Sequence, residues 1–246
     1  MNHTAARRGP GTPTPAVGAS RAPARRVGRR VSHTAALLLC SPLAATAAPQ
    51  LYETGPARDV ALVRFVNADA QTLTVTSANG ASLSLSPAAP IGDYQPARAD
   101  APMNGAWRDG TQRSAIGLTL RAGALASSVA WRAADGGLRS TSFVEAGVPF
   151  DGLHASLAFY TVAGCEQAGL TAVPGQRAVF DKQGPGSVAR RAVNPVRLTV
   201  QARCDGRAVG APLDLGQLQA GQRYSVFLIP GRDGATLIGG RDGIAH

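Results

Sequence analysis

The part of the chain after residue 47 is predicted to be all-β and to form two tandem β-sandwich domains after a cleaved signal peptide. Three observations predict this class. Short segments alternate apolar and polar residues, turn-forming Asn-Gly and Asp-Gly pairs separate such segments, and no stretch long enough for a stable helix shows amphipathic periodicity. Many short strands joined by closely spaced turns are typical of β-sandwiches.

Two hairpins follow from this alternation. Residues 72–76 and 82–86 alternate Leu or Val with Thr or Ser, and Asn79-Gly80 lies between them. Residues 196–201 alternate in the same way and are followed by Asp205-Gly206. Both dipeptides suit the positive φ angles of a tight hairpin turn. The segment 99–114, ADAPMNGAWRDGTQRS, lacks this alternation and is predicted to be a loop.

An internal repeat predicts two similar halves. Residues 120–136, LRAGALASSVAWRAADG, resemble residues 218–234, LQAGQRYSVFLIPGRDG, and each follows an apolar strand with a central phenylalanine, Phe65 or Phe159. The intervals from phenylalanine to the Ala-Gly glycine are similar, 58 and 62 residues. Chance similarity in an Ala/Gly-rich sequence is the alternative. A duplication predicts domains at 48–147 and 148–246.

Residues 1–47 are predicted to be a leader that directs export to the periplasm. A basic region precedes the apolar run ALLLCSPLAATAA (36–48), and Ala45-Thr46-Ala47 fits an A-x-A cleavage site. Cleavage after Ala47 would remove Cys40 and leave Cys165 and Cys204. An even number of cysteines in an oxidising compartment predicts a disulfide between these two.

The charge distribution argues against nucleic-acid binding. The whole chain has 25 basic and 15 acidic residues, but seven arginines precede Val31 and no acidic residue precedes position 50. The chain after residue 47 therefore carries 18 basic against 15 acidic groups, which is ordinary for a globular domain. The basic charge belongs mainly to the leader.

A search for catalytic, metal-binding and cofactor-binding motifs finds one weak candidate. Asp151 and His154 have the D-x-x-H spacing of Ser-Gly-Asn-His esterases and acetyltransferases, but Gly92-Asp93-Tyr94 stands where those enzymes need Gly-Asp-Ser. The favoured interpretation is that Asp151 ends a linker and His154 opens a strand. We expect no catalytic residues, no metal site and no cofactor, and hence no enzyme activity.

Two groups of side chains are candidates for binding. Arg190, Arg191 and Arg197 form the densest basic patch, which either contacts an acidic partner protein or polysaccharide or is a solvated edge of a sheet. Trp107 and Trp131 could stack on sugar rings, although partly buried core positions are the favoured interpretation.

Several segments together resemble the AlgF family, the periplasmic alginate O-acetylation proteins. They are Leu51-Tyr52, VRFVNA (63–68), Gly92-Asp93-Tyr94, VNPVRLTVQA (193–202) and QAGQRYSVFL (219–228). The resemblance implies a tandem β-sandwich accessory protein without catalytic residues of its own. It also implies work with membrane-bound or periplasmic O-acetyltransferase components on an exopolysaccharide, alginate or cellulose. The segment 99–114 and the two cysteines depart from the family pattern.

Three functions are therefore compared. The first is an accessory or adaptor protein for exopolysaccharide O-acetylation, whose partners are the acetyltransferase components, with the polysaccharide as a further candidate. The second is a periplasmic carbohydrate-binding or adhesion module. The third is an esterase or acetyltransferase that uses Asp151 and His154. The first predicts a protein partner, the second predicts affinity for polysaccharide, and the third predicts ester hydrolysis by the isolated protein.

Overall fold

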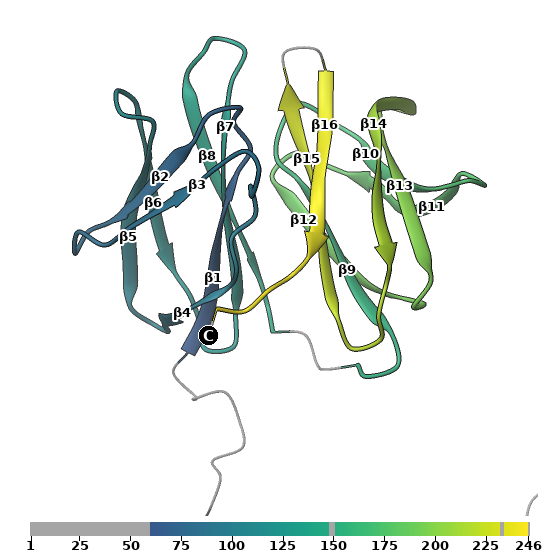
Figure 1. The fold of residues 1–246 in the computed structure, drawn as a ribbon, viewed down its shortest axis with the longest axis horizontal. Helices are drawn as coiled ribbons and strands as arrows, with labels where there is room; N and C mark the ends of the chain where they lie inside the picture. The colour runs from purple at the N-terminus through teal and green to yellow at the C-terminus, as the bar shows by residue number, and fades with distance from the viewer. Residues whose placement is uncertain (1–59, 148–150, 232–233, 246) are drawn as a thin grey trace, which may run out of the picture. The chain divides into compact units, whose positions relative to one another are not determined.

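The computed structural model describes residues 60–147, 151–231 and 234–245, which lie within one compact unit, Tyr52–His246 (Figure 1). The predicted leader, its cleavage site and Cys40 lie outside the described residues. The described part is all-β, as predicted, and it contains no helix long and apolar enough to span a membrane.

Eight strands form the first sandwich. One sheet has the order β4-β1-β7-β8 and the other has the order β3-β2-β5-β6. The strands are β1 (Val60–Asn67), β2 (Leu73–Ser77), β3 (Ser82–Leu85), β4 (Gln95–Arg98), β5 (Pro102–Arg108), β6 (Arg113–Thr119), β7 (Leu125–Arg132) and β8 (Leu138–Glu145).

Eight further strands form the second sandwich, with sheets of order β12-β9-β15-β16 and β11-β10-β13-β14. The strands are β9 (Ala155–Thr161), β10 (Ala168–Val173), β11 (Arg177–Gln183), β12 (Ser187–Val193), β13 (Arg197–Cys204), β14 (Arg207–Gln217), β15 (Arg223–Gly231) and β16 (Gly234–Arg241). Figure 1 shows the two groups of strands in chain order, from blue to green and yellow.

The two sandwiches have the same topology. Adding eight to each strand number of the first sandwich gives the strand order of the second. Both contain one parallel pair, β1 with β7 and β9 with β15, and the registers correspond: Phe65 pairs with Ser128 and Phe159 pairs with Val226. The repeat predicted from Phe65, Phe159 and the two Ala-Gly segments is therefore present in the fold.

Each sandwich has an inner sheet, which contacts the other sandwich, and an outer sheet. The inner sheets are β4-β1-β7-β8 and β12-β9-β15-β16, and an apolar cluster joins them through Val66 and Val129 on one side and Tyr160 and Phe227 on the other. The central inner strands are therefore buried on both faces. This burial explains why VALVRFVN and YSVFLIP are almost continuously apolar.

Both predicted hairpin turns are present. Gly80 joins β2 to β3 with φ +89°, and Asp205 and Gly206 join β13 to β14 with φ of 49° and 81°.

The loop prediction for 99–114 is wrong, because β5 and the start of β6 occupy this segment. Trp107 is fully buried there and its indole N–H donates to the Ser128 hydroxyl at 3.0 Å. This tertiary contact holds a strand whose Pro, Asn and Gly residues disfavour extended structure.

Candidate functional site at the junction of the two sandwiches

A buried arginine lies at the centre of the junction. Arg64, in β1, is fully buried and its side chain leaves the sheet on the face toward the second sandwich. Its Nε donates to Ser127 Oγ at 2.8 Å, and its Nη2 donates to Ser225 Oγ at 2.6 Å and to the Tyr160 hydroxyl at 3.2 Å. Its Nη1 forms an ion pair with Asp242 at 2.7 Å. We call these five residues the Arg64 cluster.

The repeat explains how one guanidinium obtains a hydroxyl from each sandwich. Ser127 follows the first Ala-Gly pair by the same number of residues as Ser225 follows the second. Ser127 pairs with Arg64 across the parallel ladder, and Ser225 pairs with Ala158 in the equivalent position. The duplicated serines therefore meet at the junction, and only the first half supplies an arginine between them.

Aromatic rings enclose the Arg64 guanidinium. Its central carbon lies 4.5 Å from the ring centroid of Tyr94, 5.2 Å from that of Phe227 and 5.7 Å from that of Tyr160. Burial opposes the charged form, but the Asp242 carboxylate and the tyrosines outweigh it and raise the pKa of Arg64 above its ordinary value. Arg64 thus remains a cation inside the protein.

A second buried ion pair crosses the junction beside the first. Arg190, in β12, donates through Nε to Glu145 of β8 at 2.7 Å and through Nη1 to Ser156 Oγ at 3.1 Å. The Tyr160 hydroxyl also donates to Glu145. Burial disfavours the Arg190 cation, yet its bonds to Glu145 raise its pKa above the ordinary value. Two ion pairs therefore connect the sandwiches in a place where water does not screen them.

The end of the chain returns to the first sandwich. Beyond β16, the Tyr94 N–H donates to the Gly243 carbonyl and the Ala245 N–H donates to the Tyr94 carbonyl, each at 2.9 Å. Ile244 and Tyr94 form a parallel bridge. We call residues 242–245 the C-terminal strap. The strap carries Asp242, the counter-ion of Arg64, so the last residues of the second half complete a site in the first.

The structure separates the three arginines predicted as a basic patch. Arg190 has a side-chain exposure of 7% and is bound within the junction. Arg197 begins β13 of the outer sheet and is ion-paired with Asp214 at 2.8 Å in an exposed position. Arg191 is exposed, and its Nη1 donates to the Val179 carbonyl at 2.6 Å. Each of the three arginines therefore has a different environment.

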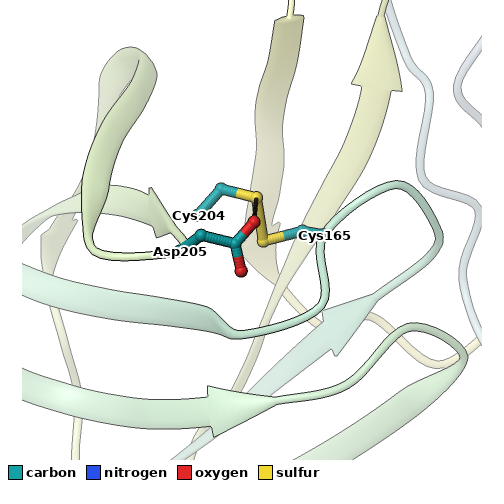
Figure 2. A group of neighbouring side chains, drawn as sticks. All are labelled: Cys165, Cys204 and Asp205. Atoms are coloured by element: carbon teal, nitrogen blue, oxygen red, sulfur yellow. Dashed lines mark hydrogen bonds between the residues drawn. A yellow bond between two sulfur atoms is a disulfide. The ribbon is translucent and has the colours of Figure 1, made fainter.

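Cys165 and Cys204 form a disulfide inside the second sandwich (Figure 2). The bond connects the segment after β9 to the end of β13, with the Cα atoms 5.6 Å apart. Together with Asp205 these residues make a group of potential metal ligands. Because both sulfur atoms are used in the disulfide, neither is available as the thiolate that a metal ion requires.

The Asp151 and His154 side chains do meet. Asp151 Oδ2 lies 2.8 Å from His154 Nδ1, and both side chains are nearly half exposed. The pKa of Asp151 is lowered, first by the Leu153 backbone N–H and then by His154. In the described part of the chain no serine or cysteine bonds to the His154 ring, and the nearby Ser156 hydroxyl accepts from Arg190 instead.

Two adjoining pockets open where β1, β7, β9 and β15 begin. The first, of about 240 Å³, is lined by residues that include Asp151, His154, Ser156, Arg190 and Arg191. The second, of about 600 Å³, is lined by residues that include Leu62, Tyr94, Leu125, Asp242 and Ile244. Gly221, Gln222 and Arg223 line both. We call the two pockets together the junction groove.

Sequence reasoning missed the residues at the centre of the junction. Arg64 lies in an otherwise apolar strand, and a single arginine in such a run is the signal that indicates a buried, paired charge. Asp242 lies in the short polar end RDGIAH, where nothing in the sequence distinguishes it from a surface residue. The pairing of these two residues, 178 positions apart, depends on the tertiary fold.

Comparison with known proteins gives structural similarity of limited extent. No protein-family model and no curated protein sequence matches the chain. The C-terminal domain of AlgF from P. aeruginosa superposes with a TM-score of 0.32 and 19% identity, over 36% of this chain and 98% of that domain. A candidate cell adhesion protein from Bacteroides ovatus superposes with a TM-score of 0.23 and 10% identity, over 77% of this chain and 100% of that one. At these TM-scores neither similarity assigns a function.

Proposed function

We propose that this protein is a non-catalytic periplasmic accessory or adaptor protein for O-acetylation of a secreted exopolysaccharide, alginate or cellulose. It acts with separate membrane-bound or periplasmic acetyltransferase components. One observation carries the proposal: three of the segments that resemble the AlgF family, VRFVNA (63–68), Gly92-Asp93-Tyr94 and QAGQRYSVFL (219–228), contribute side chains to the junction, whereas VNPVRLTVQA (193–202) lies mainly in β13 of the outer sheet. These three segments are far apart in the sequence and contact one another in the fold.

The contribution of these three segments can be followed. VRFVNA (63–68) supplies Arg64, Gly92-Asp93-Tyr94 supplies the ring that covers its guanidinium, and QAGQRYSVFL (219–228) supplies Ser225 and Phe227. A fixed junction suits an adaptor, because a partner that contacts both sandwiches then meets one preformed surface and less conformational entropy is lost on binding.

A carbohydrate-binding or adhesion module is the second candidate, and the junction groove favours it. Pockets of several hundred Å³ are of the size that holds small ligands. This candidate predicts that the purified protein binds a polysaccharide by itself. The adaptor predicts that it binds an acetyltransferase component.

The test is the acetyl content of secreted polymer, measured beside the level of the protein. Deletion of the gene should leave polymer that carries little or no acetyl ester, and replacing His154 by Ala should leave acetylation intact. Normal acetylation in the deletion strain would exclude the proposed function. Loss of acetylation in the His154→Ala strain at normal protein level would instead favour an enzyme that uses Asp151 and His154.

A further inference from the structure

We propose that a pocket at one end of the second sandwich binds the anion of a medium-chain fatty acid, with its carboxylate between Arg177 and Arg191 and its chain on an aliphatic floor. The pocket, of about 350 Å³, lies where β10 and β12 end and where β11 and β13 begin. We call it the end pocket. The proposal goes beyond the proposed function and does not depend on it.

The side chain of Arg191 points between the two sheets of the second sandwich. Arg191 pairs with Leu157 across the antiparallel ladder of β12 and β9, and Leu157 is fully buried in the core of this sandwich. Residues directly opposite each other in such a ladder place their side chains on the same face of the sheet. The bond from Arg191 Nη1 to the Val179 carbonyl at 2.6 Å therefore crosses from the inner sheet to β11 of the outer sheet, and both residues line the end pocket.

A second arginine enters the same space from the opposite sheet. Arg177 begins β11 and pairs with Ala172 of β10, which packs against the core of the sandwich. The Arg177 side chain therefore lies on the face of the outer sheet that is turned toward the inner sheet. Arg177 is exposed and has no ion-pair or hydrogen-bond partner among the residues that the structure describes. All of its guanidinium donors are thus available to a ligand.

The positive charge of the end pocket has no counter-charge in the lining. Two arginines line the pocket, and none of the described residues that line it is Asp or Glu. Because the two cations enter from opposite sheets, one anion between them is attracted by both. A carboxylate matches the planar guanidinium in two-point geometry, and Arg191 keeps donors beyond the one that Val179 accepts.

Protection of sheet edges explains the two charges but not the pocket beside them. β11 and β12 each lie at the edge of a sheet, and inward-pointing charges on edge strands prevent pairing with other chains. That role requires no concave apolar surface. Here Leu198 and Leu218 of the core cluster line the pocket, and Val196 lines it with 50% of its surface exposed. Exposed cations above a buried aliphatic floor suit an anion that carries an aliphatic chain.

The same lining disfavours a sugar acid. A uronate also carries a carboxylate, but its hydroxyls need hydrogen-bond partners when water is excluded. Of the described residues that line the pocket, Asn194 alone has a neutral polar side chain, and the others apart from the arginines are Ala, Val or Leu. A fatty-acid anion has one polar end and leaves no hydroxyl without a partner. The volume lies at the small end of the range for ligand pockets, which suits a chain of medium length.

Isothermal titration calorimetry of the purified full chain with butanoate, hexanoate and octanoate tests the proposal. We expect affinity to rise about threefold to fourfold for each added CH₂, which is the factor that corresponds to the burial of one methylene group. Octanamide has the same chain without the charge, and it should bind at least about tenfold more weakly than octanoate.

Variants of the protein assign the two ends of the ligand. Arg177→Gln and Arg191→Gln should each weaken octanoate binding at least about fivefold, whereas Arg177→Lys, which keeps the charge, should lose less than about threefold. Val196→Glu places a carboxylate beside that of the ligand and should weaken binding at least about fivefold. Arg207→Gln is the matched control, because this exposed arginine begins β14 at the opposite end of the same outer sheet. It should change affinity less than about twofold, since screening by salt removes most of its effect at that distance. Circular dichroism of each variant checks the fold.

Several results would overturn the proposal. Octanoate that shows no saturable binding excludes the ligand. Equal affinity for butanoate and octanoate, or equal losses in Arg177→Gln, Arg191→Gln and Arg207→Gln, would show that the basic surface attracts any anion. Galacturonate, or a peptide that ends in leucine, would replace the fatty acid as occupant if it bound in an Arg177-dependent manner while octanoate did not.

Discussion

Arg64 and Asp242 place opposite charges where neither is solvated, with side-chain exposures of 0% and 4%. Bringing two charges into a protein interior is costly, and their attraction offsets this cost only while both are present. Removing one partner leaves the other buried without a counter-charge. Each of the two charges is therefore tolerated in this packing only while the other is present.

Asp242→Asn should lower the free energy of unfolding by about 3–5 kcal/mol, because it leaves the Arg64 cation without its carboxylate. The double variant Arg64→Met/Asp242→Asn should recover a large part of this loss, since no unpaired charge then remains. Urea denaturation of the two single variants and the double variant measures the coupling. Additive effects would show that the two residues do not act as a pair.

The buried hydroxyl of Tyr160 should make the stability of the protein depend on pH in the alkaline range. Its burial raises the pKa of its hydroxyl well above the ordinary value of about 10. The folded protein then keeps the proton while the unfolded chain releases it. Stability is therefore complete below about pH 10 and is lost as pH rises from there through the folded pKa.

Tyr160→Phe should make this alkaline loss shallower. At pH 7 the variant should be less stable by about 1–3 kcal/mol, because Glu145 loses the hydroxyl that donates to it. Denaturation at pH 7, 9, 10 and 11 separates the two effects. An equal slope in both proteins above pH 10 would show that Tyr160 does not cause it.

Strands β15 and β16 approach more closely than most side chains allow. A Cβ at Gly239 would lie 2.5 Å from the Ser225 carbonyl oxygen and 3.1 Å from the Val226 Cα. Because these are backbone atoms in the centre of the inner sheet, they cannot move aside singly. The next residue, Gly240, has no such contact within 4 Å.

Gly239→Ala should therefore destabilise the protein by about 1–3 kcal/mol, whereas Gly240→Ala should change stability by no more than about 0.5 kcal/mol. The two variants add the same methyl group at neighbouring positions of one strand, so the comparison isolates the close approach. Thermal denaturation of both is sufficient. Equal losses would indicate a general effect of the strand.

Sequence patterns predicted the elements where local and tertiary preferences agree. The alternating segments beside Asn79-Gly80 and Asp205-Gly206 form hairpins because their turns and their buried faces require the same register. Strand β5 is not predictable in this way, because the local conformational preferences of its residues conflict with its tertiary contacts. Pro102, Asn104 and Gly105 disfavour a strand, and the burial of Trp107, which no local pattern indicates, outweighs them.

At the scale of the whole molecule, the halves were predictable and their connection was not. The repeat indicated a duplication because each half has the strands and apolar residues that form its own core. The junction depends on Arg64, Ser225 and Asp242, which are far apart in the sequence. The sequence around Arg64 and Ser225 resembles that of any other inner strand, and Asp242 follows the last strand. The density of charge along the sequence cannot distinguish the buried side chain of Arg190 from the exposed Arg191.

The junction also predicts that the two sandwiches unfold together. Both tryptophans, Trp107 and Trp131, belong to the first sandwich, and the disulfide belongs to the second. Replacing Cys165 and Cys204 by Ala removes a link that closes a sequence separation of 39 residues, which should cost up to about 4 kcal/mol on the chain-entropy model. If the two buried ion pairs and the shared apolar cluster couple the halves, tryptophan fluorescence must report this loss although the change lies in the other sandwich.

We therefore expect fluorescence and far-ultraviolet circular dichroism of the double alanine variant to shift to the same lower urea midpoint, with coincident curves. Asp242→Asn provides the contrasting background, because it weakens the junction and leaves the disulfide in place. In that background, removing the cysteines should shift the fluorescence midpoint less than it does in the unchanged chain. A fluorescence midpoint unaffected by the cysteine replacements, with a biphasic dichroism curve, would show that each sandwich is stable alone and that the junction orients the halves without joining their stability.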